Sequence, residues 1–62
     1  MTDISPRERE VLKSLSEGFS AKETAERLGI SAQTVRNHTY MAYKRLGVKN
    51  KVAAFRALGW MS

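Results

Sequence analysis

Residues 20–38 hold the pattern that decides the fold, and they read SAKETAERLGISAQTVRNH. Ser20 with Glu23 three positions later has the form of a capping box, which begins a helix. Gly29-Ile30-Ser31 then separates this helix from the next, because the glycine can adopt a positive φ and the serine can cap the second helix. A three-residue connection of this kind between two helices is typical of a helix-turn-helix.

Similar signals for the start and end of a helix divide the rest of the chain into segments. Ser5-Pro6-Arg7-Glu8 forms a second capping box, with the proline in the first turn, where its missing amide costs nothing. Gly18 and Gly47 end the segments before them, and Asn50 can cap a last segment. We therefore expect an all-α domain over residues 1–62, a four-helix bundle-like fold with a central helix-turn-helix and a short fourth helix. The expected helices cover approximately 6–16, 21–28, 32–46 and 51–58.

Composition removes several classes of function. The 62 residues include no cysteine and a single histidine, which excludes a disulfide scaffold, a thiolate metal site and a cysteine nucleophile. No apolar run approaches the ~18 residues of a membrane span. No nucleophile, base or metal-ligand constellation is present either. We expect no enzyme, no catalytic residue, no metal or other cofactor, no membrane contact and no small-molecule ligand in this domain.

Positive charge is concentrated in the second half of the chain. The formal net charge is +5. Residues 1–31 contain five basic and six acidic side chains, whereas residues 32–62 contain six basic side chains and no acidic one. Such an asymmetry indicates a polyanionic partner for the second half, nucleic acid first and an anionic membrane second. The membrane is disfavoured because the chain has no long amphipathic stretch.

The expected helix at 32–46 has two different faces. At 100° per residue, Val35, Ala42 and Leu46 fall on one stripe, which we expect to be buried. The opposite side carries five hydrogen-bonding, non-acidic side chains: Gln33, Arg36, Asn37, Tyr40 and Lys44. Arginine can donate two hydrogen bonds to guanine, and asparagine and glutamine can pair with adenine. Tyrosine and lysine can reach phosphates or base edges. An ordinary solvated face is the alternative, but such faces mix charges of both signs.

Several spaced motifs are shared with one known family. They are SPREREVL at 5–12, GFS at 18–20, LGIS at 28–31, TVRNH at 34–38 and LGV at 46–48. In these motifs the chain resembles the C-terminal DNA-binding domain of the LuxR/FixJ type, found in many bacterial response regulators and quorum-sensing regulators. The resemblance implies sequence-specific binding of double-stranded DNA in transcription regulation, with the third helix in the major groove. Two departures are Ala21, where a polar residue is usual, and Thr24, where isoleucine is usual.

The resemblance also implies roles for individual residues. Base contacts fall on Arg36, Asn37 and Tyr40, and phosphate contacts on Lys22, Thr34, Lys49, Asn50 and Lys51; Lys44, on the same exposed side of its helix, joins the phosphate contacts. In the family the fourth helix pairs two domains, so Val52 and Arg56 form a candidate face for a weak homodimer. An exposed valine without a partner is the alternative. RNA polymerase is a further candidate partner, and the expected location is the bacterial cytoplasm, in association with the nucleoid.

A different class of function stays open at this point. The basic face could belong to a helical protein-interaction module that docks an acidic partner. The aromatic side chains favour neither function, because Phe19, Phe55 and Trp60 are expected in the core rather than on a base-stacking platform. Glu8 and Glu23 are expected to cap helices rather than to act as a general acid and base.

Overall fold

Four α-helices make up the computed structural model, which describes residues 4–60 and contains no strand in that range. They are α1 (Pro6–Ser16), α2 (Ala21–Leu28), α3 (Ala32–Leu46) and α4 (Lys51–Ala57). The expected all-α fold is confirmed, while the expected domain of residues 1–62 extends beyond the described residues at both ends. Helix α4 ends one residue before the expected position 58, because Leu58 serves as its C-cap.

The helices begin at the caps that the sequence predicts. Ser5 Oγ accepts from the amide of Glu8 at 3.1 Å, and the Ser5 amide donates to Glu8 Oε1 at 2.9 Å. Ser20 and Glu23 form the same reciprocal pair at 3.1 and 2.8 Å. Each box satisfies two backbone donors that the start of a helix otherwise leaves free. The predicted capping roles of both glutamates are therefore confirmed.

The central turn has the expected conformation. Gly29 ends α2 with a φ of 71°, in the left-handed region that favours glycine. Ser31 Oγ then accepts from the amide of Thr34 at 3.0 Å and begins α3. Because the turn contains only residues 29–31, α2 and α3 are held as a helix-turn-helix pair.

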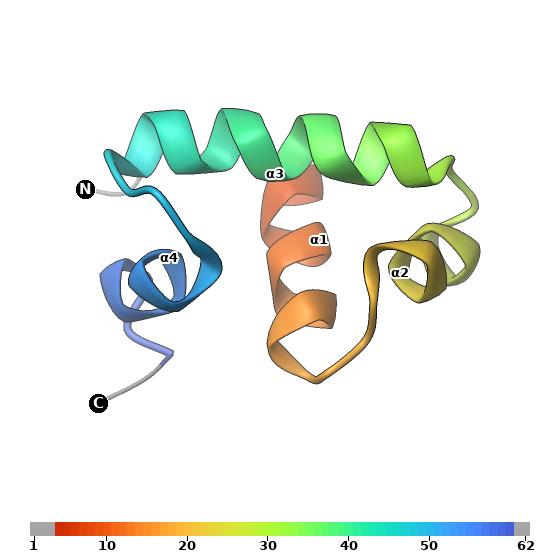
Figure 1. Cartoon of the computed structure of the whole chain (residues 1–62), viewed down its shortest axis with the longest axis horizontal. Coiled ribbons are helices and arrows are strands. Elements are labelled where there is room, and N and C mark those ends of the chain that lie inside the picture. The colour runs from red at the N-terminus through yellow and green to blue at the C-terminus, as the bar shows by residue number, and fades with distance from the viewer. Residues whose placement is uncertain (1–3, 61–62) are drawn as a thin grey trace.

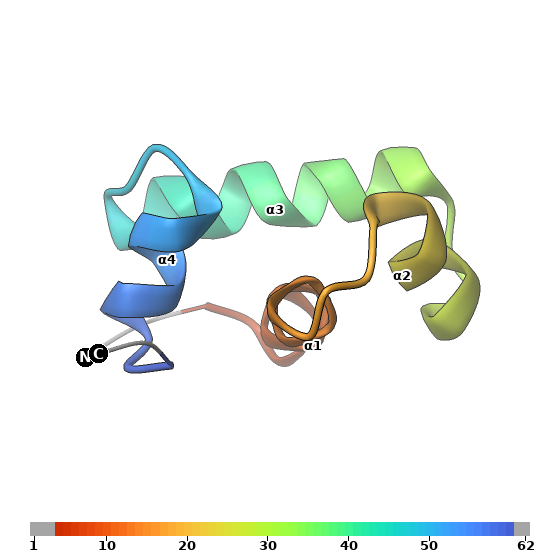
Figure 2. The same ribbon diagram turned by 60° about the horizontal axis from the view of Figure 1, so that its bottom comes forward.

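The longest helix, α3, spans the domain along its long axis (Figure 1). Helix α1 lies beneath its middle, α2 beneath one end and α4 beneath the other. In Figure 2, α1 is seen nearly end-on while α3 is still seen lengthwise, so α1 runs across α3. One long side of α3 is consequently left uncovered.

The core consists of two clusters on either side of α1. Val11 packs with Ala25 of α2 and Val35 of α3. Leu12, its neighbour in α1, packs with Ala42 of α3 and Phe55 of α4. Consecutive residues of α1 thus anchor the two halves of α3, and this arrangement fixes the orientation of its uncovered side.

Two polar contacts complete the packing and were not predicted. Arg45 Nη1 of α3 donates to the buried Glu8 Oε1 of α1 at 2.7 Å. The hydroxyls of Ser14 and Thr24, both in buried residues, share a hydrogen bond of 2.9 Å between α1 and α2. This bond gives the buried Thr24 hydroxyl a partner at the position where an isoleucine was expected.

One prediction about the core is wrong. Phe19 is 36% exposed instead of buried. Its ring lies in the connection between α1 and α2, where the Arg27 guanidinium stacks 4.0 Å from the ring centroid. Phe55 is buried as expected, and the half-buried Trp60 packs beside it with 6.0 Å between ring centroids.

Candidate nucleic-acid interface

The uncovered side of α3 carries the five polar residues that the sequence analysis placed there. All five are exposed: Gln33, Arg36, Asn37, Tyr40 and Lys44. On the opposite side, Val35 and Ala42 are completely buried and Leu46 is half-buried. The predicted division of the helix into two faces is confirmed, and we call the five exposed residues the α3 arc.

Contacts inside the α3 arc link its members in pairs one turn apart. Gln33 Nε2 donates to Asn37 Oδ1 at 3.1 Å. Lys44 Nζ lies 5.8 Å from the centroid of the Tyr40 ring. None of the three ion pairs among residues 4–60 involves Arg36, so its guanidinium keeps its donors available for an external acceptor.

The backbone beneath the α3 arc is held firmly by the core. Ile30, just before the N-cap of α3, packs against the cluster that contains Val35, in the manner of a hydrophobic staple. Thr39 Oγ1 donates to the carbonyl oxygen of Val35 at 2.8 Å. Tyr43 is half-buried against the second cluster, and burial raises the pKa of its phenol. The exposed side chains therefore project from a fixed helix.

The candidate phosphate-binding residues lie near the starts of helices. Lys22 is exposed in the first turn of α2, and Lys51 is the first residue of α4. Asn50 Oδ1 accepts from the amide of Ala53 at 2.9 Å, so it caps α4 and its side-chain NH₂ can still donate outward. Thr34 is half-buried in the first turn of α3, and its hydroxyl shares a 2.8 Å hydrogen bond with Ser31 Oγ.

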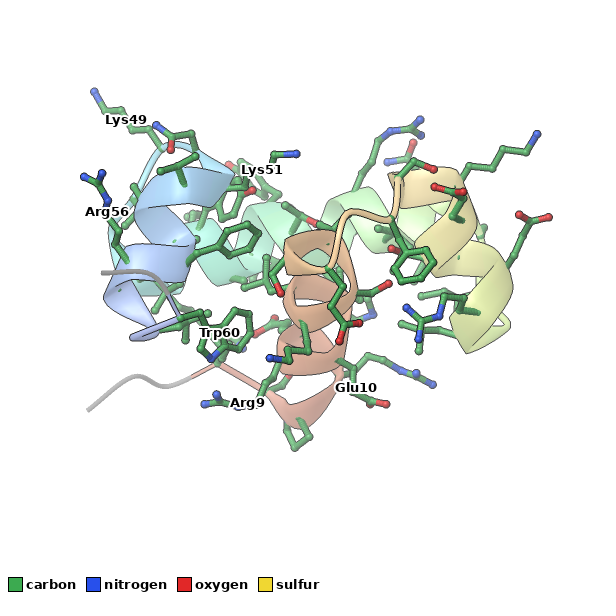
Figure 3. The ribbon with its side chains drawn as sticks, turned by 90° about the horizontal axis from the view of Figure 1, so that it is seen from below. Arg9, Glu10, Lys49, Lys51, Arg56 and Trp60 are labelled. Atoms are coloured by element: carbon green, nitrogen blue, oxygen red, sulfur yellow. The ribbon has the colours of Figure 1, made fainter. Side chains whose placement is uncertain are left out.

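Basic side chains of α4 and its preceding loop gather at one edge of the domain. Figure 3 shows Lys49 and Lys51 at the edge where α4 begins, and the first turn of α2 lies along that same edge. Arg9, Glu10 and Trp60 lie toward the opposite edge. Lys49 and Lys51 thus lie on the side of the domain away from Arg9, although the first turn of α2 also brings the acidic Glu23 to their edge.

The candidate dimer face is exposed. Val52 is 44% exposed, and Arg56, four residues later on the same side of α4, is exposed as well. Figure 3 shows Arg56 pointing outward from α4. Val52 also lines, together with Phe55 and Trp60, a hollow of about 430 Å³ between α4 and α1. The face is thus available for a second domain and has an apolar component.

Three further observations concern other kinds of site in residues 4–60. An apolar hollow of about 310 Å³ lies beside the α3 arc, and Arg36 and Tyr40 contribute to its lining. Within the described chain, no three His, Cys, Asp or Glu side chains come close enough to hold a metal ion. No helix in that range has the length and apolar character needed to cross a bilayer.

The sequence analysis missed how the α3 arc is organised internally. Gln33 appeared there as one of five polar residues and was not among the assigned base contacts. Its spacing of four from Asn37 was a usable indication, because such side chains are neighbours on a helix. Which atom donates and which accepts required the structure.

Comparison with known proteins finds similar sequences among bacterial transcription regulators. The family model described as bacterial regulatory proteins, luxR family, matches residues 2–58. The transcriptional regulatory protein DesR of Bacillus subtilis is 38% identical over 60 residues, covering 92% of this chain and 30% of DesR. The transcriptional regulatory protein UhpA of Escherichia coli is 39% identical over 59 residues, again 92% and 30%. The putative HTH-type transcriptional regulator YhjB of Escherichia coli is 43% identical over 54 residues, 87% and 27%.

The chain spans about 30% of the length of DesR and of UhpA. No solved structure gives a significant match.

Proposed function

The chain belongs to the luxR family of bacterial regulatory proteins, whose DNA-binding helix-turn-helix it shares, and from that premise we propose that it binds double-stranded DNA sequence-specifically with α3 in the major groove. In this role the domain places a bacterial transcription regulator at its site on the nucleoid, in the cytoplasm.

The observation that carries the proposal is the acid-free, exposed α3 arc on a buried and fixed helix. The major groove of B-DNA admits an α-helix and presents a distinct pattern of donors and acceptors for each base pair. Arg36, Asn37 and Tyr40 are the proposed base contacts. Arg36 has a free planar fork that suits the O6 and N7 acceptors of guanine, and the Asn37 amide suits adenine.

Phosphate contacts position the domain and supply much of its affinity. We assign this role to Lys44 within the α3 arc and to five residues outside it: Lys22, Thr34, Lys49, Asn50 and Lys51. Helix starts are favourable places for such contacts, because free backbone amides and the helix dipole attract an anion. The Asn50 NH₂ remains a donor because only Oδ1 is used in capping.

The domain is proposed to bind as a weak homodimer on a repeated or palindromic site. Val52 and Arg56 on α4 form the proposed contact between the two copies. One apolar and one basic side chain offer little area, which suits a contact that forms on adjacent half-sites rather than in free solution. RNA polymerase is a further partner that we propose at the level of the whole regulator.

One experiment tests the proposal. Binding to a pool of random-sequence duplexes is measured by fluorescence anisotropy at several salt concentrations, and bound sequences are then selected and read. The four lysines among the proposed phosphate contacts predict that log K falls against log salt with a slope of about −4. Selection should return one preferred motif, in two copies if α4 pairs the domains.

Two results would contradict the proposal. Steep salt dependence without a selected motif would indicate nonspecific attraction, and tight binding to an acidic protein without DNA binding would indicate the interaction module. A single-copy motif would contradict the homodimer and leave the reading helix in place.

A further inference from the structure

Gln33 and Asn37 are joined by the only side-chain hydrogen bond found within the α3 arc in the described chain. Gln33 Nε2 donates to Asn37 Oδ1 at 3.1 Å, and both residues are exposed. Gln33 lies in the first turn of α3, one turn before Asn37. The bond therefore links a residue without an assigned role to a proposed base contact.

The bond determines how the Asn37 amide faces outward. A free asparagine amide on a helix surface can present either its oxygen or its nitrogen to a given side, because the torsion at its end is broad. The Gln33 donor can be accepted only by the oxygen, which selects one of these two orientations. Asn37 keeps both hydrogens on Nδ2 and the second lone pair of Oδ1 for an external partner.

These remaining groups match one base. Adenine presents an N6 donor and an N7 acceptor in the major groove, and an asparagine pairs with both through its oxygen and its nitrogen. An amide already fixed in one orientation loses less conformational freedom when it makes those two bonds. A wrongly turned amide would place its nitrogen against the N6 donor.

We propose that Gln33 is a positioning residue that orients the Asn37 amide for adenine, and so contributes to sequence preference without contacting the base itself. This inference rests on the proposed function. The role of Gln33 differs from that of Arg36, a proposed base contact whose guanidinium takes part in none of the ion pairs among residues 4–60.

Three substitutions separate positioning from general surface effects. Gln33→Ala removes the donor, and Gln33→Glu is nearly isosteric but can only accept, so it would turn the Asn37 amide over. Gln33→Lys keeps a donor at this position, on a side chain one bond longer. The matched control is Lys44→Ala, which changes the same face of α3 at a proposed phosphate contact.

The readout is the ratio of affinities for the selected duplex and for the same duplex with the adenine pair replaced. The ratio should fall about three- to tenfold in Gln33→Ala and Gln33→Glu, the effect of one hydrogen bond. It should be retained in Gln33→Lys and in Lys44→Ala, although Lys44→Ala weakens binding to both duplexes. In an Asn37→Ala background, Gln33→Ala should leave the ratio unchanged. Circular dichroism confirms that each variant is folded.

Three outcomes would overturn the inference. They are an unchanged ratio in Gln33→Ala, a loss of preference at a different base pair, which would make Gln33 a direct reader, and an additive effect in the Asn37→Ala background. Failure of the proposed function is distinguishable, because the unsubstituted protein would then show no preferred duplex at all.

Discussion

Arg45 Nη1 donates to Glu8 Oε1 across 2.7 Å and so joins the last turn of α3 to the first turn of α1. The Glu8 side chain is only 5% exposed, whereas that of Arg45 is 42% exposed. The same carboxylate oxygen also accepts from the Ser5 amide at 2.9 Å. One buried carboxylate thus begins α1 and holds the far end of the proposed reading helix.

Because the Glu8 side chain is buried and the Arg45 side chain is exposed, substitutions of the two residues should have different consequences. Arg45→Ala should destabilise the domain by about 1–3 kcal/mol, because it leaves a charged carboxylate almost buried without its cation. Adding Glu8→Gln to Arg45→Ala should recover part of that loss, since the amide oxygen can still accept from Ser5. Urea unfolding of the single and double variants provides the measurement. A double variant less stable than Arg45→Ala alone would contradict this account.

The Ser14–Thr24 hydrogen bond allows a similar test between α1 and α2. Ser14→Ala should cost about 1–3 kcal/mol, because it leaves the fully buried Thr24 hydroxyl without a partner. The double variant Ser14→Ala/Thr24→Val replaces both hydroxyls and should be closer to the original protein than Ser14→Ala is. Thermal unfolding of the original protein, both single variants and the double variant measures the coupling free energy of the two hydroxyls. Additive losses would show that the bond contributes nothing beyond the two separate side chains.

The capping box of α2 predicts a pH effect. Hydrogen bonds from the backbone and side chain of Ser20 lower the pKa of Glu23 below its usual value. A carboxyl with a lowered pKa in the folded state stabilises the fold above its unfolded pKa and loses this effect as the pH falls through the folded pKa. Stability measured from about pH 6 down to about pH 3 should therefore fall less in Glu23→Gln than in the original protein. Parallel curves for the two proteins would exclude this contribution.

The two edges of the domain predict different salt behaviour. Lys49→Ala should reduce the slope of log K against log salt by about 1, because one phosphate contact is lost. Arg9→Ala removes the same charge near the opposite edge and should leave that slope almost unchanged. Titrations of one duplex at three salt concentrations compare the two. Equal effects would indicate that net charge, and not a defined face, governs binding.

Local features of the fold could be predicted from the sequence, whereas contacts between distant segments could not. Caps such as Ser20–Glu23 depend on residues three positions apart, and the exposed side of α3 follows from helical periodicity. The Arg45–Glu8 pair spans 37 residues and forms only after α1 and α3 have packed. Phe19 was misplaced for a similar reason, because its stacking with Arg27 depends on how the α1–α2 connection folds.

The exposed residues of the candidate site could likewise be predicted from the sequence, whereas the direction of the hydrogen bond between two of them could not. Periodicity placed Arg36, Asn37 and Tyr40 on one exposed side, and the structure confirms their exposure. Their roles in base recognition stay predictions that depend on binding experiments. The direction of the Gln33–Asn37 bond was not accessible from spacing, because an amide can act as donor or acceptor.

The most direct measurement of the central claim is the sequence preference of Arg36→Ala, obtained by selection from random duplexes beside the original protein and Lys49→Ala. If α3 lies in the major groove, Arg36→Ala should lose about 1–3 kcal/mol of preference at one guanine-containing base pair and keep the rest of the motif. Lys49→Ala should bind more weakly and retain the whole motif. An unchanged motif in Arg36→Ala would contradict the assignment of α3 as the reading helix.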